Sequence, residues 1–524
     1  MKKIFILFLI AATFNGCKKS YFDINDNPNN PTDANVSADL LAPGALATSG
    51  NISTGATYIR LQTGVAPFPT TTTRFSMLGR WLGIWSPGTN FAASDESKYL
   101  AATNTSTADW RNRYDNINDY QTMQKKADGT GQTFYSGIAR IMKAWNFHQL
   151  VDLYNNVPYK QAVNADFIQP KYDDAAVIYA DLFNEITEGI NAIKSADISK
   201  NIKLSTADIM FKGDKVKWAK FGNTLKLRLL IHQSQLSNSA AIAATQIAII
   251  DAEGSGYLNE GQTAQVNPGY TTANSNPYWT THMYGNGCTP IPDNFNRANN
   301  FSLNTMKLLN DQRFKQFYLP VRGKSGTSDA DWKGIDYAPT NSDPNFTEGK
   351  LSDIGGARTC TPGGTLGLGK SPEMASWIIT GFESLFLQAE ARSRGWITTG
   401  PSAQVLYTRA VTESFSWLGI SASAPAYLAQ TDARIAWPAT QPDQIKVIAW
   451  QKYFAFNGNN HLEIWNDYRR LAVVNIPLSV DPGRGSNPIP LRLQYPESEY
   501  SFNNGNVVSQ GAINPFTTKV FWNQ

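Results

Sequence analysis

Residues 133–154 read TFYSGIARIMKAWNFHQLVDLY, and this stretch sets the fold class of the chain. Large side chains recur in it at steps of three and four residues, at Tyr135, Ile138, Met142, Trp145 and Gln149. A period of about 3.6 residues places such a set on one face of an α-helix. The stretch therefore predicts an amphipathic helix over 133–154.

The same pattern recurs on both sides of this stretch. It predicts further helices over 108–125, 174–193, 214–232, 239–252, 371–394, 402–418, 441–457 and 460–470. The helix over 371–394 is expected to begin with Ser371 as its cap and Pro372 in its first turn. We expect paired antiparallel helices to form a scaffold over about 108–252 and 371–470.

Two segments interrupt the helical pattern, about 60–107 and 253–370. In the second, Gly, Pro, Asn and Thr recur every few residues among aromatic residues, and only a short helix near 302–309 is predicted. Loops longer than about 15 residues are usually functional. The sequence therefore predicts a mainly α protein with a single body over 37–524, in which helix pairs carry a large, irregular, loop-rich ligand-binding region.

The composition limits the partners of this body. Only 17% of the 524 residues are Asp, Glu, Lys or Arg, and the net charge is +4. The surface must therefore take its polarity from Asn, Thr, Ser and Gln, which is typical of exported proteins. A charge so near to neutral predicts no nucleic-acid partner.

The N-terminus carries a sorting signal. Lys2 and Lys3 precede an apolar run that ends at Ala12 and is too short to cross a bilayer, so residues 1–16 are predicted to be a signal peptide. Cys17 and the residues before it resemble the lipobox of bacterial lipoproteins. The resemblance implies that Cys17 is lipidated and that 17–36, rich in Asn and Pro, is a tether. A secreted protein with a chance cysteine is the alternative.

Two other cysteines remain, Cys288 and Cys360. They form no CxxC pair, so they do not indicate a metal site. Export to an oxidising space would permit a disulfide between them, but the sequence does not show whether they approach each other. A disulfide and two free thiols both stay open.

Phrases spread along the chain resemble the SusD/RagB family of outer-membrane nutrient-binding lipoproteins, in the SusD-like branch of Bacteroidota. They are DLYNNVPY at 152–159, WAKFGNTLKLR at 218–228, ESLFLQAEA at 383–391, QKY at 451–453, WNDYRR at 465–470 and PLRLQYP at 490–496. Glu390 or Glu463 facing Arg228, Arg469 or Arg470 is expected to form partly buried ion pairs between helices.

The resemblance implies both a fold and a role. The fold would be tetratricopeptide-like helix pairs that hold an irregular ligand face. The protein would be anchored by lipid in the cell outer membrane, facing the exterior, where it binds oligosaccharides and delivers them to a SusC-like TonB-dependent transporter. It would use no cofactor. A peptide-binding member of the same family is one alternative.

Candidate ligand residues follow from the chemistry of sugars. A sugar ring has an apolar C–H face and a rim of hydroxyls, so flat aromatic rings together with Asn or Arg side chains can hold it. Three loops combine these residue types: Trp81, Trp85 and Asn90 in the first, Tyr278, Trp279, Tyr284, Asn286 and Arg297 in the second, and Trp332 with Tyr337 in the third. For each ring the alternative is a loop residue folded back over the core.

Motifs for catalysis are weak. Residues 364–371, GTLGLGKS, match the P-loop pattern, but no buried strand precedes them and Pro372 follows, so no nucleotide site is expected. The chain has no GxSxG and no HExxH motif. We therefore expect no enzyme and no metal site. A surface glycoside hydrolase is the remaining alternative, because its carboxylate pair leaves no signature in sequence.

Overall fold

The structure is a computed structural model that describes residues 36–55, 74–92, 94–100, 103–289, 295–339, 342–356 and 359–524. The predicted signal peptide, Cys17 and nearly all of the tether lie outside the described residues. So does part of the predicted loop-rich segment 60–107.

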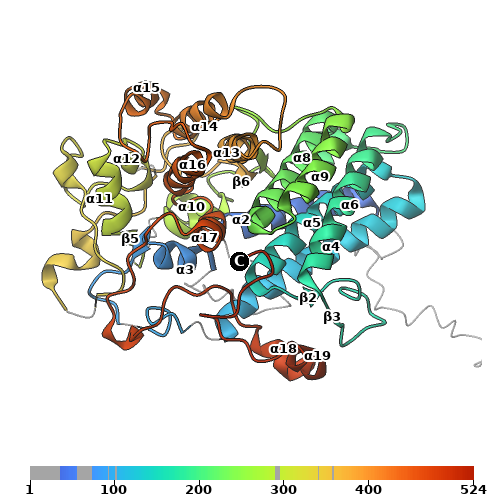
Figure 1. The fold of residues 1–524 in the computed structure, drawn as a ribbon, viewed down its shortest axis with the longest axis horizontal. Helices are drawn as coiled ribbons and strands as arrows, with labels where there is room; N and C mark the ends of the chain where they lie inside the picture. Colours follow the sequence, from blue (N-terminus) through green and yellow to red (C-terminus); the bar gives the residue numbers. More distant parts are fainter. Residues whose placement is uncertain are drawn as a thin grey trace, which may run out of the picture.

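Long helices form one side of the molecule (Figure 1). They are α4 (Thr103–Thr130), α5 (Thr133–Tyr154), α6 (Ala175–Lys194), α8 (Lys215–His232) and α9 (Ser239–Glu253). Helix α5 packs between α4 and α6, and α6 packs against α8. The apolar stripe of α6, which includes Ile178, Leu182 and Ile186, is buried against these neighbours. The predicted scaffold helices are thus confirmed, and α4 extends beyond its predicted ends.

Polar caps explain where two of these helices begin. The Asp174 carboxylate accepts hydrogen bonds from the main-chain N–H groups of Ala176 and Val177 at the start of α6. The Asp214 carboxylate accepts one from the N–H of Lys217 at the start of α8. Such caps satisfy donors that have no partner within the helix, so they fix each helix start in the sequence.

A second group of helices lies beside the first. It consists of α13 (Gly381–Ser393), α14 (Ala403–Trp417), α16 (Gln441–Ala455) and α17 (His461–Leu471). Helix α13 packs against α14, α16 and α8, and α17 also contacts α8. The two groups therefore share one continuous core in which α8 and α13 are neighbours.

The prediction of a helix over 371–394 is wrong in its first part. Helix α13 begins only at Gly381, after Thr380, whose side-chain oxygen accepts a hydrogen bond from the N–H of Glu383. The residues before it form strand β6 (Ser376–Ile379), which pairs antiparallel with β4 (Ala264–Val266). All four residues of β6 are buried. Bulky and β-branched side chains that are buried on both faces favour a strand, and this overrides the apparent cap at Ser371.

The remaining elements are short strands and further α-helices. Two-residue strands pair β1 (Trp85–Ser86) with β5 (Arg297–Ala298) and β2 (Val157–Pro158) with β3 (Tyr172–Asp173). The other helices are α2 (Ala38–Ser53), α3 (Arg74–Trp81), α7 (Leu204–Ala207), α10 (Pro277–His282), α11 (Asn300–Leu308), α12 (Phe314–Phe317), α15 (Ala424–Leu428), α18 (Glu497–Phe502) and α19 (Asn504–Val508). Of these, only α11 coincides with a predicted helix.

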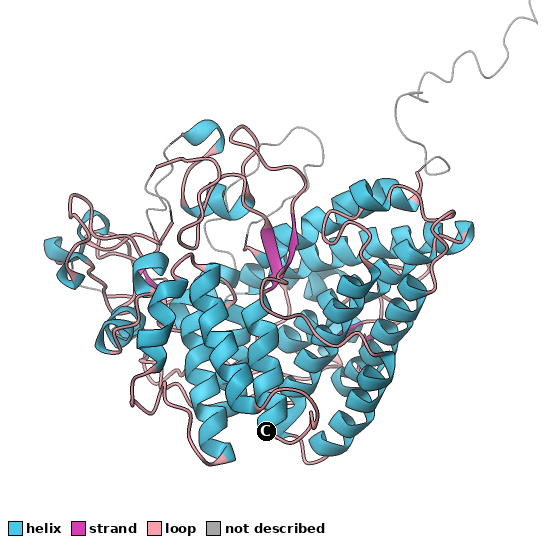
Figure 2. Ribbon diagram, turned by 90° about the horizontal axis from the view of Figure 1, so that it is seen from above, coloured by secondary structure: helices cyan, strands magenta, loops and turns pink. Residues whose placement is uncertain are grey.

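The loop-rich segment lies at one end of the molecule. Helices α11 and α12 and the loops around them occupy the end of the long axis opposite to α4 and α6 (Figure 1). Seen from above, loops crowd that end while the long helices stand together at the other (Figure 2). None of the helices in the described part of the chain has the length and apolar character needed to cross a bilayer.

Candidate functional site

Most of the aromatic rings predicted to face a ligand are buried. Trp81, Trp85, Tyr278 and Trp279 are each 0% exposed. Trp81 belongs to α3 rather than to a loop, and its Nε1 donates a hydrogen bond to the main-chain oxygen of Glu96 at 3.2 Å. The expectation that these four rings stand open on loops is therefore wrong, because they fill the core beneath the loops.

Two of the predicted loops nevertheless meet. The Trp85 ring lies 5.4 Å from that of His282, and the His282 ring lies 4.7 Å from that of Tyr278. Phe75 and His461 complete this aromatic cluster, with 4.4 Å between their ring centroids. Edge and tilted contacts of this kind favour close packing of the loops on the helices. The cluster anchors the loop-rich region on the scaffold.

The predicted polar residues hold loops together. The Arg297 guanidinium is buried and donates to the Glu348 carboxylate at 2.8 Å, with Asp353 3.2 Å away. Asn90 is exposed, and its side-chain oxygen accepts a hydrogen bond from the N–H of Glu348 at 2.9 Å. The exposed Asn286 accepts one from the N–H of Ser275 at 3.0 Å. The contacts of Asn90 and Arg297 with Glu348 connect segments that are far apart in the sequence, whereas the Asn286 contact stays within its own loop.

Of the remaining predicted aromatic residues, Tyr284 lies nearer the surface, whereas Trp332 and Tyr337 are buried. Tyr284 is half-buried and stacks on Trp279, with 5.4 Å between ring centroids and 29° between ring planes. Trp332 is 5% exposed, and its Nε1 donates to the main-chain oxygen of Tyr318 at 2.9 Å. Tyr337, named beside Trp332 in the third loop, is buried.

A disulfide bond joins Cys288 to Cys360. The pairing that the sequence left open is thus present in the structure. It ties the loop after α10, which contains Tyr284 and Asn286 as well as Cys288, to the glycine-rich segment 359–371. The bond therefore restrains the two loops relative to each other.

A surface groove of about 630 Å³ lies beside this disulfide. Its lining combines apolar surface, uncharged polar groups and two lysines, from Lys315, Gln316, Leu319, Pro320, Ser325, Gly326, Trp332, Gly356, Thr359, Gly363, Gly364, Thr365, Leu366 and Lys370. The volume lies within the range of about 300–1,000 Å³ that is usual for small-ligand sites. Leu366 is 57% exposed and offers apolar surface to a ligand.

Backbone contacts fix the walls of the groove. The N–H of Leu368 donates to the main-chain oxygen of Gln316 at 3.3 Å, so the glycine-rich segment lies against α12. A Cβ on Gly356 would clash with the Met283 sulfur, and a Cβ on Gly364 would clash with the main-chain oxygen of Lys370. Close approach of the chain thus requires glycine at these two positions.

The sequence did not predict this groove as a site, although part of its wall belongs to residues 364–371, which match the P-loop pattern. Gly364, Thr365, Leu366 and Lys370 adopt an irregular loop that opens no helix, so they provide no phosphate cradle. An exposed leucine among glycines was the available signal, because large apolar side chains on a polar loop are informative. Of the predicted ligand residues, only Trp332 lines this groove.

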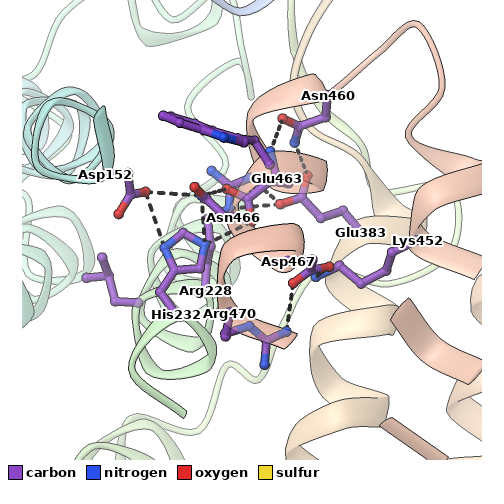
Figure 3. A network of polar contacts seen from close by, with 12 residues as sticks. Asp152, Arg228, His232, Glu383, Lys452, Asn460, Glu463, Asn466, Asp467 and Arg470 are labelled. Carbon is purple, nitrogen blue, oxygen red and sulfur yellow. Dashed lines mark hydrogen bonds and ion pairs between the residues drawn. The ribbon is translucent and has the colours of Figure 1, made fainter. Parts of the chain in front are cut away.

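The other conspicuous cluster is a buried network of charges between the two helix groups (Figure 3). His232 of α8 lies between Asp152 of α5 and Glu463 of α17, at 3.3 Å from Asp152 Oδ2 and 2.9 Å from Glu463 Oε2. Arg228 pairs with Glu383, and Arg470 pairs with Glu390. The predicted ion pairs between helices are therefore confirmed for Glu390 with Arg470, whereas Arg228 uses Glu383.

Electrostatics make His232 the cation at the centre of this network. Burial by itself would lower the pKa of His232, but the carboxylates of Glu463 and Asp152 overcome that penalty and raise it to about 9. Burial lowers the pKa of the neighbouring His148 to about 3, so that ring is neutral. The protonated imidazole thus neutralises one of two buried carboxylate charges, and the Arg228 guanidinium also acts on Glu463.

The same network includes a possible metal-ligand set. One ligand atom each from His148, Asp152 and Glu463 lies within 4.8 Å of the other two. The His232 imidazolium already bonds to both of these carboxylates, and the Arg228 guanidinium also lowers the pKa of Glu463. The donor set therefore fits an internal ion-pair network better than a metal, and its role is to join the helices.

Comparisons with known proteins agree with this architecture. A SusD-like family model, described as starch-binding associating with outer membrane, matches residues 51–496. A SusD homolog from Bacteroides fragilis superposes with a TM-score of 0.72 at 18% identity, covering 93% of this chain and 100% of that chain. A chitin-binding SusD homolog from Flavobacterium johnsoniae superposes with a TM-score of 0.71 at 20% identity, covering 92% and 98%. No curated protein matches the chain.

Proposed function

The chain belongs to the SusD-like family, and we propose that it is a non-enzymatic surface lipoprotein that binds oligosaccharides and delivers them to a SusC-like TonB-dependent transporter. The observation that carries the binding role is the groove of about 630 Å³ beside the disulfide. The starch-binding description of the family and the chitin-binding relative support a glycan as the ligand.

The lining of the groove suits a sugar. Trp332, Leu319, Pro320 and Leu366 supply apolar surface for the C–H face of a ring. Gln316, Ser325, Thr359 and Thr365, together with glycine main chain, supply donors and acceptors for the hydroxyl rim. Because water competes for each of these contacts at the surface, we expect weak binding that strengthens with the number of sugar units.

The residues predicted from the sequence take different roles in this proposal. Trp332 contacts the ligand in the groove. Tyr284 and Asn286 form a second contact beside it, because Cys288, which follows them, is bonded to Cys360, the neighbour of Thr359 in the groove wall. We assign the buried Trp81, Trp85, Tyr278, Trp279 and Arg297, and the loop-capping Asn90, to support of the loops.

Binding at the groove is tested by calorimetry with maltohexaose and chitohexaose. We expect Leu366→Ala to weaken binding several-fold, since it removes apolar surface from the site. Leu40→Ala is the matched control, because Leu40 is 56% exposed on α2 and lies outside the groove. Equal affinities in both variants, tighter binding of peptides than of glycans, or release of shortened sugars would contradict the proposal.

Anchoring and partner complete the proposed function. We propose cleavage after residue 16, lipidation of Cys17, a tether over 17–36 and exposure of the single body 37–524 on the cell exterior.

Two experiments test the anchor and the exposure. Labelling with a radioactive fatty acid should be lost in Cys17→Ser. Protease added to intact cells should digest the wild-type protein. Failure of a tagged chain to copurify with a TonB-dependent transporter from its own cells would contradict the delivery role.

A further inference from the structure

The groove is not electrically neutral. Among the described residues that line it, the charged ones are Lys315 and Lys370, and no aspartate or glutamate lines it. The protein as a whole is nearly balanced, with 46 Lys and Arg against 42 Asp and Glu. A lining whose charges are all positive therefore differs from the average surface and creates a local positive potential.

Lys315 has a weak partner. Its Nζ lies 2.9 Å from Oδ1 of Asp329, which is 47% exposed, and it also lies over the Trp332 ring at 5.6 Å from the centroid. An exposed ion pair contributes little because solvent screens it and both side chains lose freedom. The ammonium group can therefore exchange Asp329 for an anionic ligand at small cost.

Lys370 forms no ion pair within the described part of the chain. Its Nζ donates to the main-chain oxygen of Trp417 and lies over the ring of the same residue at 4.5 Å from the centroid. Glu413 is the carboxylate that acts on it, and one oxygen of Glu413 accepts a hydrogen bond from the N–H of Gly261. Burial lowers the pKa of Lys370 to about 8, against the raising effect of Glu413.

The two lysines belong to segments that touch. Lys315 lies on α12 and precedes Gln316, whose main-chain oxygen accepts the hydrogen bond from Leu368, two residues before Lys370. We propose that this groove selects oligosaccharides that carry an anionic group, a carboxylate or a sulfate, which binds between Lys315 and Lys370. This inference rests on the proposed function and adds the substrate class.

Matched pairs of sugars test the inference in the full chain. One pair is hexagalacturonate and its fully methyl-esterified form, and the other is a κ-carrageenan hexasaccharide and its desulfated form. Within each pair the sugar backbone stays the same, and the charge is removed by methylating the carboxylate in the first pair and by replacing sulfate with hydroxyl in the second. By calorimetry we expect at least one charged member to bind about fivefold or more tightly than its neutral partner. The pair that shows the difference identifies carboxylate or sulfate as the preferred anion.

Variants locate the effect. Lys315→Gln and Lys370→Met should each reduce the preference for the charged sugar, and Lys200→Gln, an exposed lysine outside the groove, should leave it unchanged. Lys370→Arg keeps the charge, so it should retain the preference and reports on folding at this position.

In the wild-type protein, the preference for the charged sugar should fall between pH 7 and pH 9, because Lys370 loses its proton over this range. It should also fall when salt is added, because salt screens the attraction.

The outcomes separate this inference from the proposed function. If charged and neutral members bind equally, or if only maltohexaose or chitohexaose bind, the groove has no anionic preference and the inference is overturned while glycan binding stands. If Lys315→Gln and Lys370→Met both retain the preference, the anion binds elsewhere and the inference is again overturned. If no oligosaccharide binds, both fail.

Discussion

Four helices meet at His232. It connects α5 through Asp152, α8 through its own backbone and α17 through Glu463. Tyr179 of α6 also bonds to Asp152 and contacts the same imidazole at 3.2 Å. Removing one partner of such a buried set leaves an uncompensated charge, which is costly. The network therefore specifies how the two helix groups pack.

The charge on His232 should make the stability of the protein depend on pH. The carboxylates of Glu463 and Asp152 raise the pKa of His232 from its ordinary value of 6.5 to about 9. The contribution of His232 to the free energy of unfolding is therefore fully present below pH 6.5. It is lost as the pH rises through 9, and the total loss is about 3 kcal/mol. Urea unfolding of the wild-type protein at several pH values measures this fall.

Two variants of buried histidines separate this effect from general destabilisation. His232→Gln should have a lower free energy of unfolding than the wild-type protein at pH 6.5. Between pH 6.5 and pH 9 it should also lack the fall in this free energy that deprotonation of His232 causes. His148→Gln should keep the fall, because the pKa of His148 is lowered to about 3 and its ring stays neutral throughout. An unchanged pH dependence in His232→Gln would show that this residue is not the cation in the network.

At the scale of elements, α5 and α6 approach each other through two glycines. A Cβ on Gly137 would lie 2.5 Å from the main-chain oxygen of Gly189 and 2.6 Å from Cγ1 of Ile193. Backbone oxygen cannot move away as a flexible side chain can, so the helices themselves would have to separate. The crossing therefore depends on small residues at both positions.

Substitution of Gly137 and of Gly129 by alanine should change the free energy of unfolding in opposite directions. Gly137→Ala is expected to lower the free energy of unfolding by about 1–3 kcal/mol, because it overpacks the helix crossing. Gly129→Ala in α4 is the matched control, since a Cβ there meets no atom within 4 Å. The control should raise stability by about 0.5–1 kcal/mol through helix propensity. Thermal unfolding of both variants measures the difference, and equal destabilisation would contradict the close crossing.

The disulfide connects two loops of the ligand region. Cys288→Ser combined with Cys360→Ser releases a closed loop spanning a sequence separation of 72, for which chain entropy alone predicts a loss of about 4 kcal/mol. Because Thr359 beside Cys360 lines the groove, the double variant should also bind maltohexaose more weakly. Calorimetry of the wild-type protein and the double variant checks both losses. Unchanged stability and affinity would show that the loops hold their positions without the bond.

The helices were predictable where periodicity and caps agree, and the exceptions have physical causes. Asp174 and Asp214 placed the starts of α6 and α8 to within a residue, because each caps its helix. The segment 376–379 also fits a helical stripe, and only its pairing with β4 makes it a strand. Helix α2 contains Pro43, which conceals it from sequence reasoning.

The candidate site was less predictable than the scaffold. Trp81 and Trp85 lie in a glycine- and proline-containing stretch, which suggested exposed loop rings, yet both are buried by contacts with residues distant in the sequence. The sequence indicated Trp332 but not Lys315 or Leu366, because the groove forms only when α12 lies against the glycine-rich segment. Burial and concavity are tertiary properties that no local pattern encodes.

At the scale of the whole molecule, one part of the protein is a helical support and another is a loop-rich region with the candidate binding site. The long helices and the buried network around His232 form the support, and the loop-rich end seen in Figure 1 includes α12, which contributes Lys315 and Gln316 to the groove. Loops placed on a rigid scaffold are common binding sites, since they vary without cost to the core. Solved structures of SusD homologs share this fold over more than nine-tenths of this chain.

A crystal structure of the full chain with maltohexaose, chitohexaose or hexagalacturonate tests the central claim most directly. The account predicts an intact sugar in the groove, in contact with Trp332 and Leu366 and beside the bond between Cys288 and Cys360. A sugar seated at another surface with the groove empty, or a cleaved sugar in the groove, would contradict the account.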